Sequence, residues 1–237
     1  MFSSFVQWVE GLSLTFSAGR WEALFKNFPL LLSGLGITIV AAILGLLLAL
    51  TLGVVFGVLS ASRNLLGKAL ARVYVEFFQN TPLMLQLVFL FFGLSIAWKA
   101  FGLLPGLAVG VIGLGLYHGA YISEAVRAGI QSISKGQLEA SLSQGMSYVE
   151  AMRYVVIPQA LTVVLPPLTN QTVNLVKNSS VLLYISVHEL MYQAKSIQAA
   201  NYNPGPVYLT VIVIYFCLCF PLARLAKKLE DRSEEAR

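Results

Sequence analysis

Residues 33–60, SGLGITIVAAILGLLLALTLGVVFGVLS, decide the fold of this protein. The run contains no charged side chain, and the charges that bound it are Lys26 and Arg63. A helix needs about 20 consecutive apolar residues to cross the hydrocarbon core of a bilayer. The stretch is therefore long enough to be a transmembrane helix, and we predict an integral membrane protein.

Composition extends this prediction to the whole chain. Hydrophobic residues make up 57% of the 237 residues and charged residues 11%, whereas a soluble domain has about 25% charged residues. The 19 glycines agree with this class, because glycine lets transmembrane helices approach closely. No basic run is interleaved with aromatic residues as on a surface for single-stranded nucleic acid. We therefore expect no nucleic-acid partner, and we interpret the net charge of +5 as an orientation signal.

Charged residues mark the ends of the remaining spans, because a charge near the bilayer centre costs at least ~2.5 kcal/mol. We predict an all-α fold, a polytopic bundle of about five transmembrane helices near 33–60, 73–97, 104–127, 155–178 and 206–226. The fourth is expected to be a broken helix, which the bilayer tolerates only where protein or a water-filled cavity satisfies the backbone. The residues that interrupt it are Pro158, Pro166, Pro167, Asn170, Gln171 and Asn174.

The basic residues predict the orientation, because short cytoplasmic loops carry an excess of Lys and Arg. One side holds Arg63, Lys68, Arg72, Arg127, Lys135, Arg153, Arg224, Lys227, Lys228, Arg232 and Arg237. The other side holds Arg20, Lys26, Lys99 and Lys195. We therefore place the N-terminus outside and the C-terminus in the cytoplasm, which requires an odd number of spans.

This topology divides the chain into three parts. Residues 1–32 form an external N-terminal segment, residues 33–228 the transmembrane domain, and residues 229–237 a cytoplasmic tail. The N-terminal segment is expected to stay on the mature chain, because its first residues, Met1 to Ser4, lack the basic region of a signal peptide.

Small residues line one face of two predicted helices at four-residue spacing. The first helix carries Gly45, Ala49, Gly53 and Gly57, and the third carries two such pairs, Gly106 and Gly110, then Gly115 and Gly119. Such faces allow close helix packing, either inside this bundle or against a second copy. Contact with a ligand is the less favoured alternative.

The longest polar segment lies between the third and fourth spans, from Arg127 to Tyr154. It is too long for a simple turn. Residues 137–144 are expected to form a short helix that ends at Gly145 in the left-handed conformation. Residues 147–150, Ser-Tyr-Val-Glu, can open a second helix with a capping box. A helix–turn–helix here would offer a docking surface, although a solvated connecting loop is the alternative.

Within this segment the sequence resembles a known family. Glu139-Ala140-Ser141, Gly145, Val155 and Ile157-Pro158 resemble the Glu-Ala-Ala loop of permease subunits of bacterial ATP-binding-cassette importers. Three stretches resemble the branch that carries polar amino acids such as histidine, glutamate, glutamine, arginine and opines: residues 74–83, 121–159 and 165–177. The resemblance extends from about Gly34 to Lys228.

The resemblance implies a permease subunit that moves polar amino acids into the cell through the bacterial inner membrane. Separate ATPase subunits on the cytoplasmic side, a second permease subunit, identical or sister, and an external solute-binding protein would be its partners. Residues 128–154 would be the coupling loop to the ATPase. The motif residues that carry this role are Gly136, Glu139, Ala140, Ser141, Gly145 and Pro158.

No cofactor is expected in this chain. It lacks the Gly-x-x-x-x-Gly-Lys-Ser/Thr phosphate loop, so ATP and Mg²⁺ would be bound by the ATPase partner and the chain is not expected to be an enzyme. One departure from the family is Gln79-Asn80, where the branch often has Arg-Gly. We transfer no role for that arginine.

A polar stripe on the fourth predicted helix is the candidate substrate pathway. Asn170, Asn174, Lys177 and Asn178 are spaced so that they share one face. They either bond neighbouring helices or line the path, where Lys177 or the amides would meet the carboxylate of an amino acid.

Two acidic residues near the cytoplasmic ends of the helices are weaker pathway candidates. Glu76 can pair with Arg72, and Glu124 with Arg127, at helical spacing. Structural pairing is the favoured interpretation, and a role in gating or substrate contact is the alternative.

The remaining reactive residues do not predict a catalytic or metal site. His118 is expected to be packed and hydrogen-bonded rather than a proton relay, and Cys217 and Cys219 to pack between helices. His188-Glu189 lacks the second histidine of a zinc-protease helix. The alternative functions are a stand-alone secondary transporter or channel for small polar solutes and a membrane-embedded enzyme, for which His118, Glu124 and His188 are too scattered.

Overall fold

A computed structural model describes residues 11, 15–62 and 64–235, and within these ranges every regular element is a helix. The all-α prediction is therefore confirmed. Residues 1–10, 12–14, 63, 236 and 237 lie outside the described residues, and with them the first residues of the N-terminal segment and two cations of the orientation argument, Arg63 and Arg237.

The helices follow one another along the chain in the order α2 (Ala18–Lys26), α3 (Phe28–Ala61), α4 (Leu65–Gln79), α5 (Leu83–Val88), η1 (Phe89–Gly93), α6 (Leu94–Ala97), α7 (Lys99–Gly102), α8 (Gly106–Ser132), α9 (Lys135–Ser143), α10 (Tyr148–Ala151), η2 (Met152–Val156), α11 (Ile157–Asn178), η3 (Ser179–Ile185), α12 (Leu190–Asn201) and α13 (Pro204–Glu235). Four helical stretches are long and apolar enough to cross a membrane, namely Phe28–Ala61, Gly106–Ser132, Tyr148–Ile185 and Pro204–Asp231. A fifth span exists if the bent pair Leu65–Gln79 and Leu83–Ala97 is one crossing.

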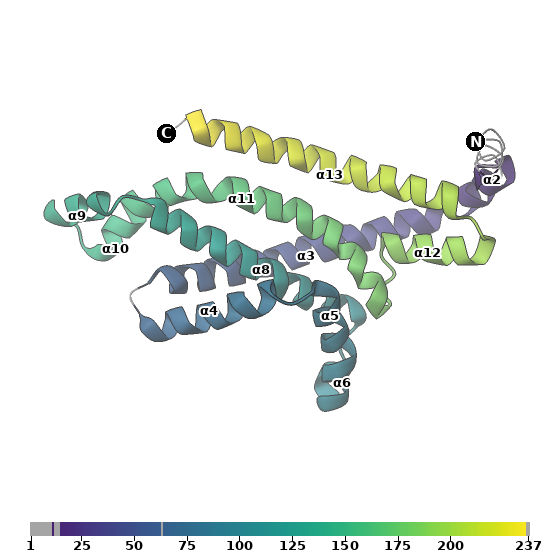
Figure 1. Ribbon diagram of the computed structural model, residues 1–237, viewed down its shortest axis with the longest axis horizontal. Coiled ribbons are helices and arrows are strands. Elements are labelled where there is room, and N and C mark those ends of the chain that lie inside the picture. Colours follow the sequence, from purple (N-terminus) through teal and green to yellow (C-terminus); the bar gives the residue numbers. More distant parts are fainter. Residues whose placement is uncertain (1–10, 12–14, 63, 236–237) are drawn as a thin grey trace, which may run out of the picture.

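The centre of the bundle is the contact between α3 and α8, which run side by side (Figure 1). The small-residue face of α3 makes this contact: a Cβ added to Gly53 would lie 2.3 Å from Ile122 Cγ2, and one added to Gly57 would lie 2.6 Å from Val126 Cβ. Both distances are too short for real atoms, so only glycine lets the two backbones come this close. The predicted small face therefore packs inside the bundle.

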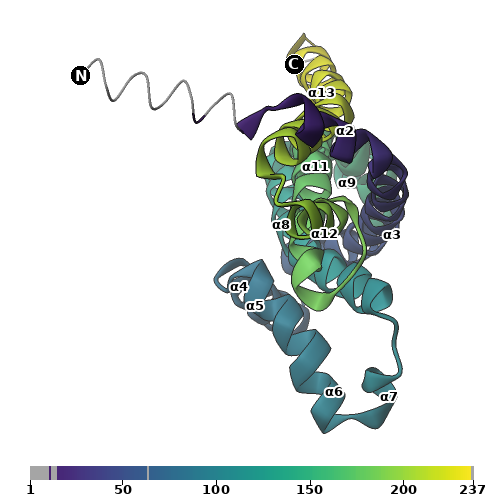
Figure 2. The same cartoon turned by 90° about the vertical axis from the view of Figure 1, so that its right-hand side faces the viewer.

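The second predicted span, near 73–97, is wrong as a single helix. The chain turns by 103° between α4 and α5. Pro82 causes the break, because it has no N–H to donate and keeps the preceding residue out of the helical conformation. The side-chain amide of Gln86 donates to the carbonyl oxygens of Phe78 and Thr81, each at 3.0 Å, and so satisfies carbonyls that the break leaves without helical partners. Figure 2 shows α5, α6 and α7 extending away from the bundle.

The prediction that the fourth span is broken at its prolines is also wrong. Helix α11 runs without interruption through Pro166 and Pro167. Pro158 follows closely after the π-helical turn η2, whose wider hydrogen-bonding pattern accommodates a residue without an N–H. Irregular helix lies instead at both ends, as the π-helical turn η2 before α11 and the 3₁₀-helix η3 after it.

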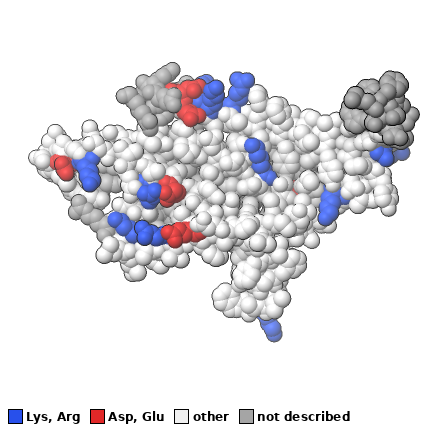
Figure 3. All heavy atoms as spheres, viewed as in Figure 1, with Lys and Arg blue, Asp and Glu red and all other residues white. Residues whose placement is uncertain are grey.

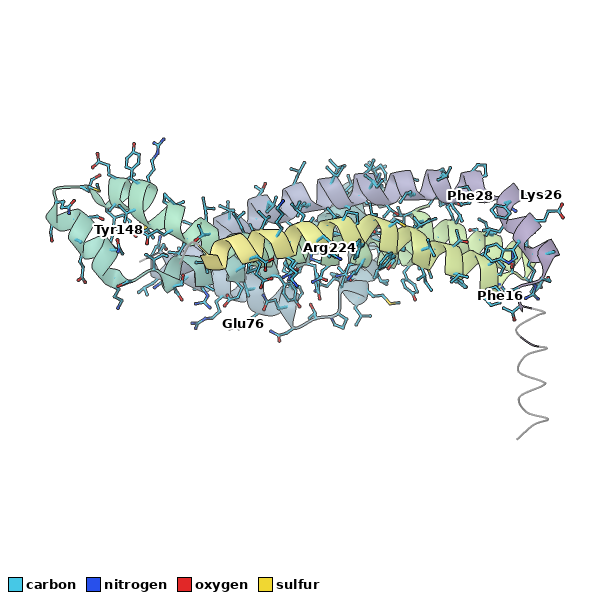
Figure 4. All side chains as sticks on the ribbon, turned by 90° about the horizontal axis from the view of Figure 1, so that it is seen from above. Phe16, Lys26, Phe28, Glu76, Tyr148 and Arg224 are labelled. Carbon is cyan, nitrogen blue, oxygen red and sulfur yellow. The ribbon has the colours of Figure 1, made fainter. Side chains whose placement is uncertain are left out.

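The molecule has two distinct ends. We call α9, α10 and the turn between them, residues 135–151, the finger; it projects at the end of the bundle where α13 finishes, whereas α2 and α12 lie at the opposite end (Figure 1). On the face drawn in Figure 3, charged side chains gather toward the finger end and the middle of the bundle is mostly uncharged. Figure 4 shows Tyr148 at the finger end, Lys26 and Phe28 at the opposite end, and Glu76 between them.

Candidate functional site

The finger is built by two capping structures that the sequence specifies. Helix α9 ends with Gly145 at φ +89°, where the N–H of Gly145 bonds to the carbonyl of Leu142 at 3.0 Å and that of Met146 to the carbonyl of Ser141 at 3.2 Å. These two bonds are the Schellman motif, which needs a left-handed residue and therefore favours glycine. The predicted left-handed turn at Gly145 is confirmed.

Helix α10 begins with the predicted capping box. The backbone N–H of Ser147 donates to Glu150 Oε2 at 2.8 Å, and the N–H of Glu150 donates to Ser147 Oγ at 3.3 Å. Each residue thus satisfies the free N–H of the other, which fixes how the chain enters α10. With both ends of the turn fixed, the finger is a defined helix–turn–helix and not a solvated loop.

The finger presents most of the predicted coupling residues to solvent. Gly136, Glu139, Ala140 and Gly145 are exposed. Ser141 is buried, and its hydroxyl donates to the carbonyl of Gln137 at 2.7 Å. Pro158 is not part of the finger, because it lies in the first turn of α11.

Glu76 and Glu124 come together at one cavity between α4 and α8. The cavity has a volume of about 530 Å³, and its polar lining includes Lys68, Arg72, Glu76, Gln79, Glu124, Arg127 and Gln131. Both predicted ion pairs are present: Arg72 Nε lies 3.9 Å from Glu76 Oε1, and Arg127 Nε lies 3.1 and 3.0 Å from the two oxygens of Glu124. The cavity wall therefore carries side chains of both charges.

The polar stripe of α11 divides between two surroundings. Asn170, Asn174 and Lys177 are exposed along the outer face. Asn178, which the sequence placed on the same face, is half-buried instead, and its Nδ2 lies 3.2 Å from Nε2 of His118. Lys177 also lines a second cavity, of about 680 Å³, between α11 and α13.

His118 connects α8 to α11. It is buried, and its Nδ1 lies 3.1 Å from Oε1 of Gln171 while its Nε2 faces the amide of Asn178. The Gln171 oxygen can only accept and the Asn178 amide nitrogen can only donate, so this arrangement fits a neutral ring with its proton on Nδ1. The prediction that His118 is packed and hydrogen-bonded is confirmed.

The cavity between α11 and α13 contains residues that the sequence reasoning missed. Besides Lys177, its wall includes Tyr208, Tyr215 and Cys219 from α13 and Met191 from α12. Cys219 is buried and Cys217 is exposed, so only the second of the two cysteines packs inside the protein. The tyrosines gave no signal in the sequence, because the apolar run of α13 hides which face turns inward.

Sequence reasoning also missed Glu189, which is fully buried at the start of α12. An acidic residue directly before an apolar helical run is a possible N-cap, and this was the available signal. Among the described residues, no group of three or more His, Cys, Asp and Glu side chains could hold a metal ion.

Comparisons with known proteins agree in pointing to membrane transport. Residues 53–235 match the protein family described as "Binding-protein-dependent transport system inner membrane component". The chain is 40% identical over 213 residues to the probable glutamine ABC transporter permease protein GlnM of Bacillus subtilis (strain 168), covering 90% of this chain and 97% of that protein. It is 34% identical over 212 residues to the glutamine transport system permease protein GlnP of Escherichia coli (strain K12), covering 90% and 96%.

Solved structures have the same fold. A crystal structure of an amino acid ABC transporter with histidines matches with a TM-score of 0.79 and 34% identity, covering 88% of this chain and 96% of that one. An inward-facing structure of the MetNI methionine ABC transporter matches with a TM-score of 0.67 at 20% identity, which shows likeness of fold alone.

Proposed function

The chain belongs to the family of inner membrane components of binding-protein-dependent transport systems, and on that premise we propose that it is the permease subunit of an ATP-driven importer of polar amino acids. The relatives whose names mention glutamine or amino acids support this substrate class. ATP hydrolysis belongs to a separate ATPase subunit, which binds ATP and Mg²⁺. An external solute-binding protein delivers the amino acid.

The observation that carries the proposal is the exposed finger. Its two helices are fixed by the Schellman motif and the capping box, so the finger is rigid enough to transmit a displacement. Glu139 and Ala140 are exposed in the middle of α9. A carboxylate can make a charge-assisted contact with a partner, and alanine permits close approach of that partner's backbone. The finger is the docking site for the ATPase subunit.

Displacement of the finger reaches the membrane helices through α8 and α11. The finger joins α8 through Ile133 and Ser134 and continues through η2 into α11. In alternating access, these helices switch between an outward-open and an inward-open arrangement. The nucleotide bound to the ATPase determines which arrangement is favoured.

The outer face of α11 is the substrate pathway in this proposal. Asn170, Asn174 and Lys177 are exposed on that face. Asn178 instead contacts His118 and so joins α11 to α8. Unpaired polar groups on a membrane helix need water or a partner, which a path between two permease subunits provides. The cavity with Glu76 and Glu124, nearer the finger, is the exit to the cytoplasm.

Copurification tests the ATPase partnership. The C-terminally tagged chain is solubilised gently from native membranes, and the proteins that accompany it are identified by mass spectrometry. The Gly145→Val variant places a β-branched residue at φ +89°, which distorts the turn. The matched control is Gly36→Val, because a Cβ at Gly36 meets nothing within 4 Å. We expect an ATPase subunit with wild type and with Gly36→Val, and severalfold less of it with Gly145→Val.

A second pair of variants separates the charge of the finger from its shape. Glu139→Lys reverses an exposed charge on α9 of the finger, and Glu22→Lys reverses an exposed charge on α2 at the opposite end. Loss of the ATPase only with Glu139→Lys would support docking at the finger. Recovery of wild type without any ATPase, under conditions that preserve other membrane complexes, would instead indicate a stand-alone transporter or channel.

A further inference from the structure

Glu189 is a buried acid that the proposed transport path does not use. Its side chain is fully buried, and it is the N-cap of α12. Its two oxygens accept hydrogen bonds from the backbone N–H groups of Met191 at 2.9 Å and Tyr192 at 2.7 Å. These bonds satisfy two of the free N–H groups of the first turn, so the carboxyl determines where α12 begins.

The same carboxyl reaches two further helices. Tyr215 of α13 donates its hydroxyl to Glu189 Oε2 at 3.3 Å, and the hydroxyl of Thr38 in α3 lies 3.5 Å from the same oxygen. Thr38 also accepts the N–H of Leu190 at 3.1 Å. A Cβ added to Gly34 of α3 would lie 3.0 Å from the Glu189 carbonyl, so α3 packs directly on this segment. Glu189 is therefore the point where α3, α12 and α13 meet.

No cation neutralises this carboxyl: in the part of the chain that the structure describes, Glu189 forms no ion pair. From α13 the titratable neighbour is Tyr215, and from its own segment the neighbours are Tyr192 and His188, whose rings stack at 4.4 Å. Helix α3 contributes the hydroxyl of Thr38, which does not titrate. Burial raises the pKa of the Glu189 carboxyl to about 7, although the amide and hydroxyl donors act in the opposite direction.

Two partners of Glu189 also form the wall of the cavity between α11 and α13. Tyr215 and Met191 both line it, together with Lys177 and Cys219. Glu189 does not line the cavity itself, but it is hydrogen-bonded to two residues that do, Met191 of α12 and Tyr215 of α13. Movement of these two helices apart would break the Tyr215 hydrogen bond and widen the cavity.

We propose that Glu189 is a positioning residue for transport. By tying α12 to α13 it keeps the cavity between α11 and α13 narrow, which we call the closed arrangement, and the cavity widens when the Tyr215 hydrogen bond breaks. This rests on the proposed function, because it takes the cavity as part of the transport path. A protonated acid fits the closed arrangement if its O–H donates to the hydroxyl oxygen of Tyr215, which can also accept, because a neutral group loses little in a dry site. Opening admits water to the carboxyl, and the hydrated carboxyl ionises in its ordinary range.

The sign of the pH dependence follows from this difference. The closed form binds the proton more tightly than the open form, so a rise in pH favours opening. Between about pH 6 and about pH 8 the ratio of open to closed molecules should increase by up to about tenfold. A variant that cannot ionise at this position should lose the effect.

Cys219 reports on the cavity directly. In a Cys217→Ser background, Cys219 is the remaining cysteine, and its labelling rate with a water-soluble maleimide is measured on the full chain in lipid nanodiscs. The thiol itself reacts faster at higher pH, so each rate is divided by the rate of Glu189→Gln at the same pH. We expect this quotient to exceed one already at about pH 6, because the open form is ionised there, and to rise by up to about a further tenfold by about pH 8.

A tyrosine pair supplies the matched control. Tyr215→Phe removes the hydroxyl that contacts Glu189 and should increase labelling at both pH values severalfold. Tyr208→Phe removes the other tyrosine hydroxyl of the cavity wall and should leave the rate unchanged. A quotient that stays flat with pH, or equal rates for the two tyrosine variants, would overturn the proposal. Labelling needs neither ATP nor substrate, so this result is independent of whether an ATPase copurifies.

Discussion

Asn174 and Asn178 lie four residues apart on one helix and have different surroundings. Asn178 is half-buried and faces the ring of His118, whereas Asn174 is exposed one turn earlier. An asparagine whose amide is already engaged with a histidine stabilises the bundle. An exposed asparagine on a membrane helix has amide groups available for a solute. Asn174 is therefore the residue at which a pathway role can be separated from a structural one.

We predict that Asn174→Leu impairs transport without unfolding the chain. Loss of one substrate hydrogen bond of about 1.4 kcal/mol corresponds to about a tenfold weaker apparent affinity. The measurement is uptake of radiolabelled amino acid by the reconstituted complex over a range of substrate concentrations. The control is Asn201→Leu, at the exposed end of α12, for which uptake should stay normal. Unchanged uptake kinetics with Asn174→Leu would remove this residue from the pathway.

The sequence predicted contacts between residues close in the chain better than those between distant residues. The ion pairs Arg72–Glu76 and Glu124–Arg127 follow from helical spacing, and both are present. The contacts of His118 with Gln171 and Asn178 join residues of separate helices, and spacing along the chain carries no information about them. For the same reason the contacts of Glu189 with α3 and α13 could not be predicted, although its role as the N-cap of α12 could have been.

Among the elements, α3 and the finger agree with their predictions because each is specified locally. An apolar run defines α3, and a glycine followed by Ser-x-x-Glu defines the finger. The prediction of the second span was wrong because its limits were taken only from the positions of charged residues. Helix α4 begins at Leu65, where Asn64 caps it, and carries Lys68 and Arg72 within its first turns. Helix α12 was missed because its 12 residues are too few to span a membrane and lie in the connection between two spans.

Close packing of α3 against α8 leads to a prediction at the scale of the element. Gly53→Ala places a methyl group 2.3 Å from Ile122 Cγ2, so the helices must separate. Such overpacking costs about 1–3 kcal/mol, and we expect a lower midpoint of thermal unfolding in detergent. Ile122→Ala added to Gly53→Ala should recover part of the loss, because it removes the opposing atoms.

The matched control lies on the same helix. Gly36→Ala adds the same methyl group where nothing lies within 4 Å, so it should leave the midpoint unchanged or raise it slightly through better helix propensity. If Gly53→Ala were as stable as Gly36→Ala, the close contact between α3 and α8 would not be present in the membrane.

At the scale of the whole molecule, the two ends of the bundle differ in charge and in architecture. The finger end carries Lys68, Arg72, Arg127, Lys135 and Arg153, and the opposite end carries the short helices α2 and α12. Cytoplasmic surfaces of membrane proteins are enriched in Lys and Arg. If the finger is the docking site proposed above, an ATPase that uses cytoplasmic ATP must bind it on that side. The charge distribution and the proposed docking site therefore predict the same orientation, with the finger in the cytoplasm and α12 outside.

This orientation predicts which residues a membrane-impermeant reagent can reach in intact cells. With Cys217 and Cys219 replaced by serine, Lys195→Cys on α12 should react with an impermeant maleimide before the cells are opened. Ser143→Cys on α9 should react only after permeabilisation. Both replaced side chains are exposed, so access to the reagent depends on the side of the membrane and not on burial. The reverse pattern would place the finger outside, where no ATP-driven subunit could reach it, and would contradict the importer mechanism.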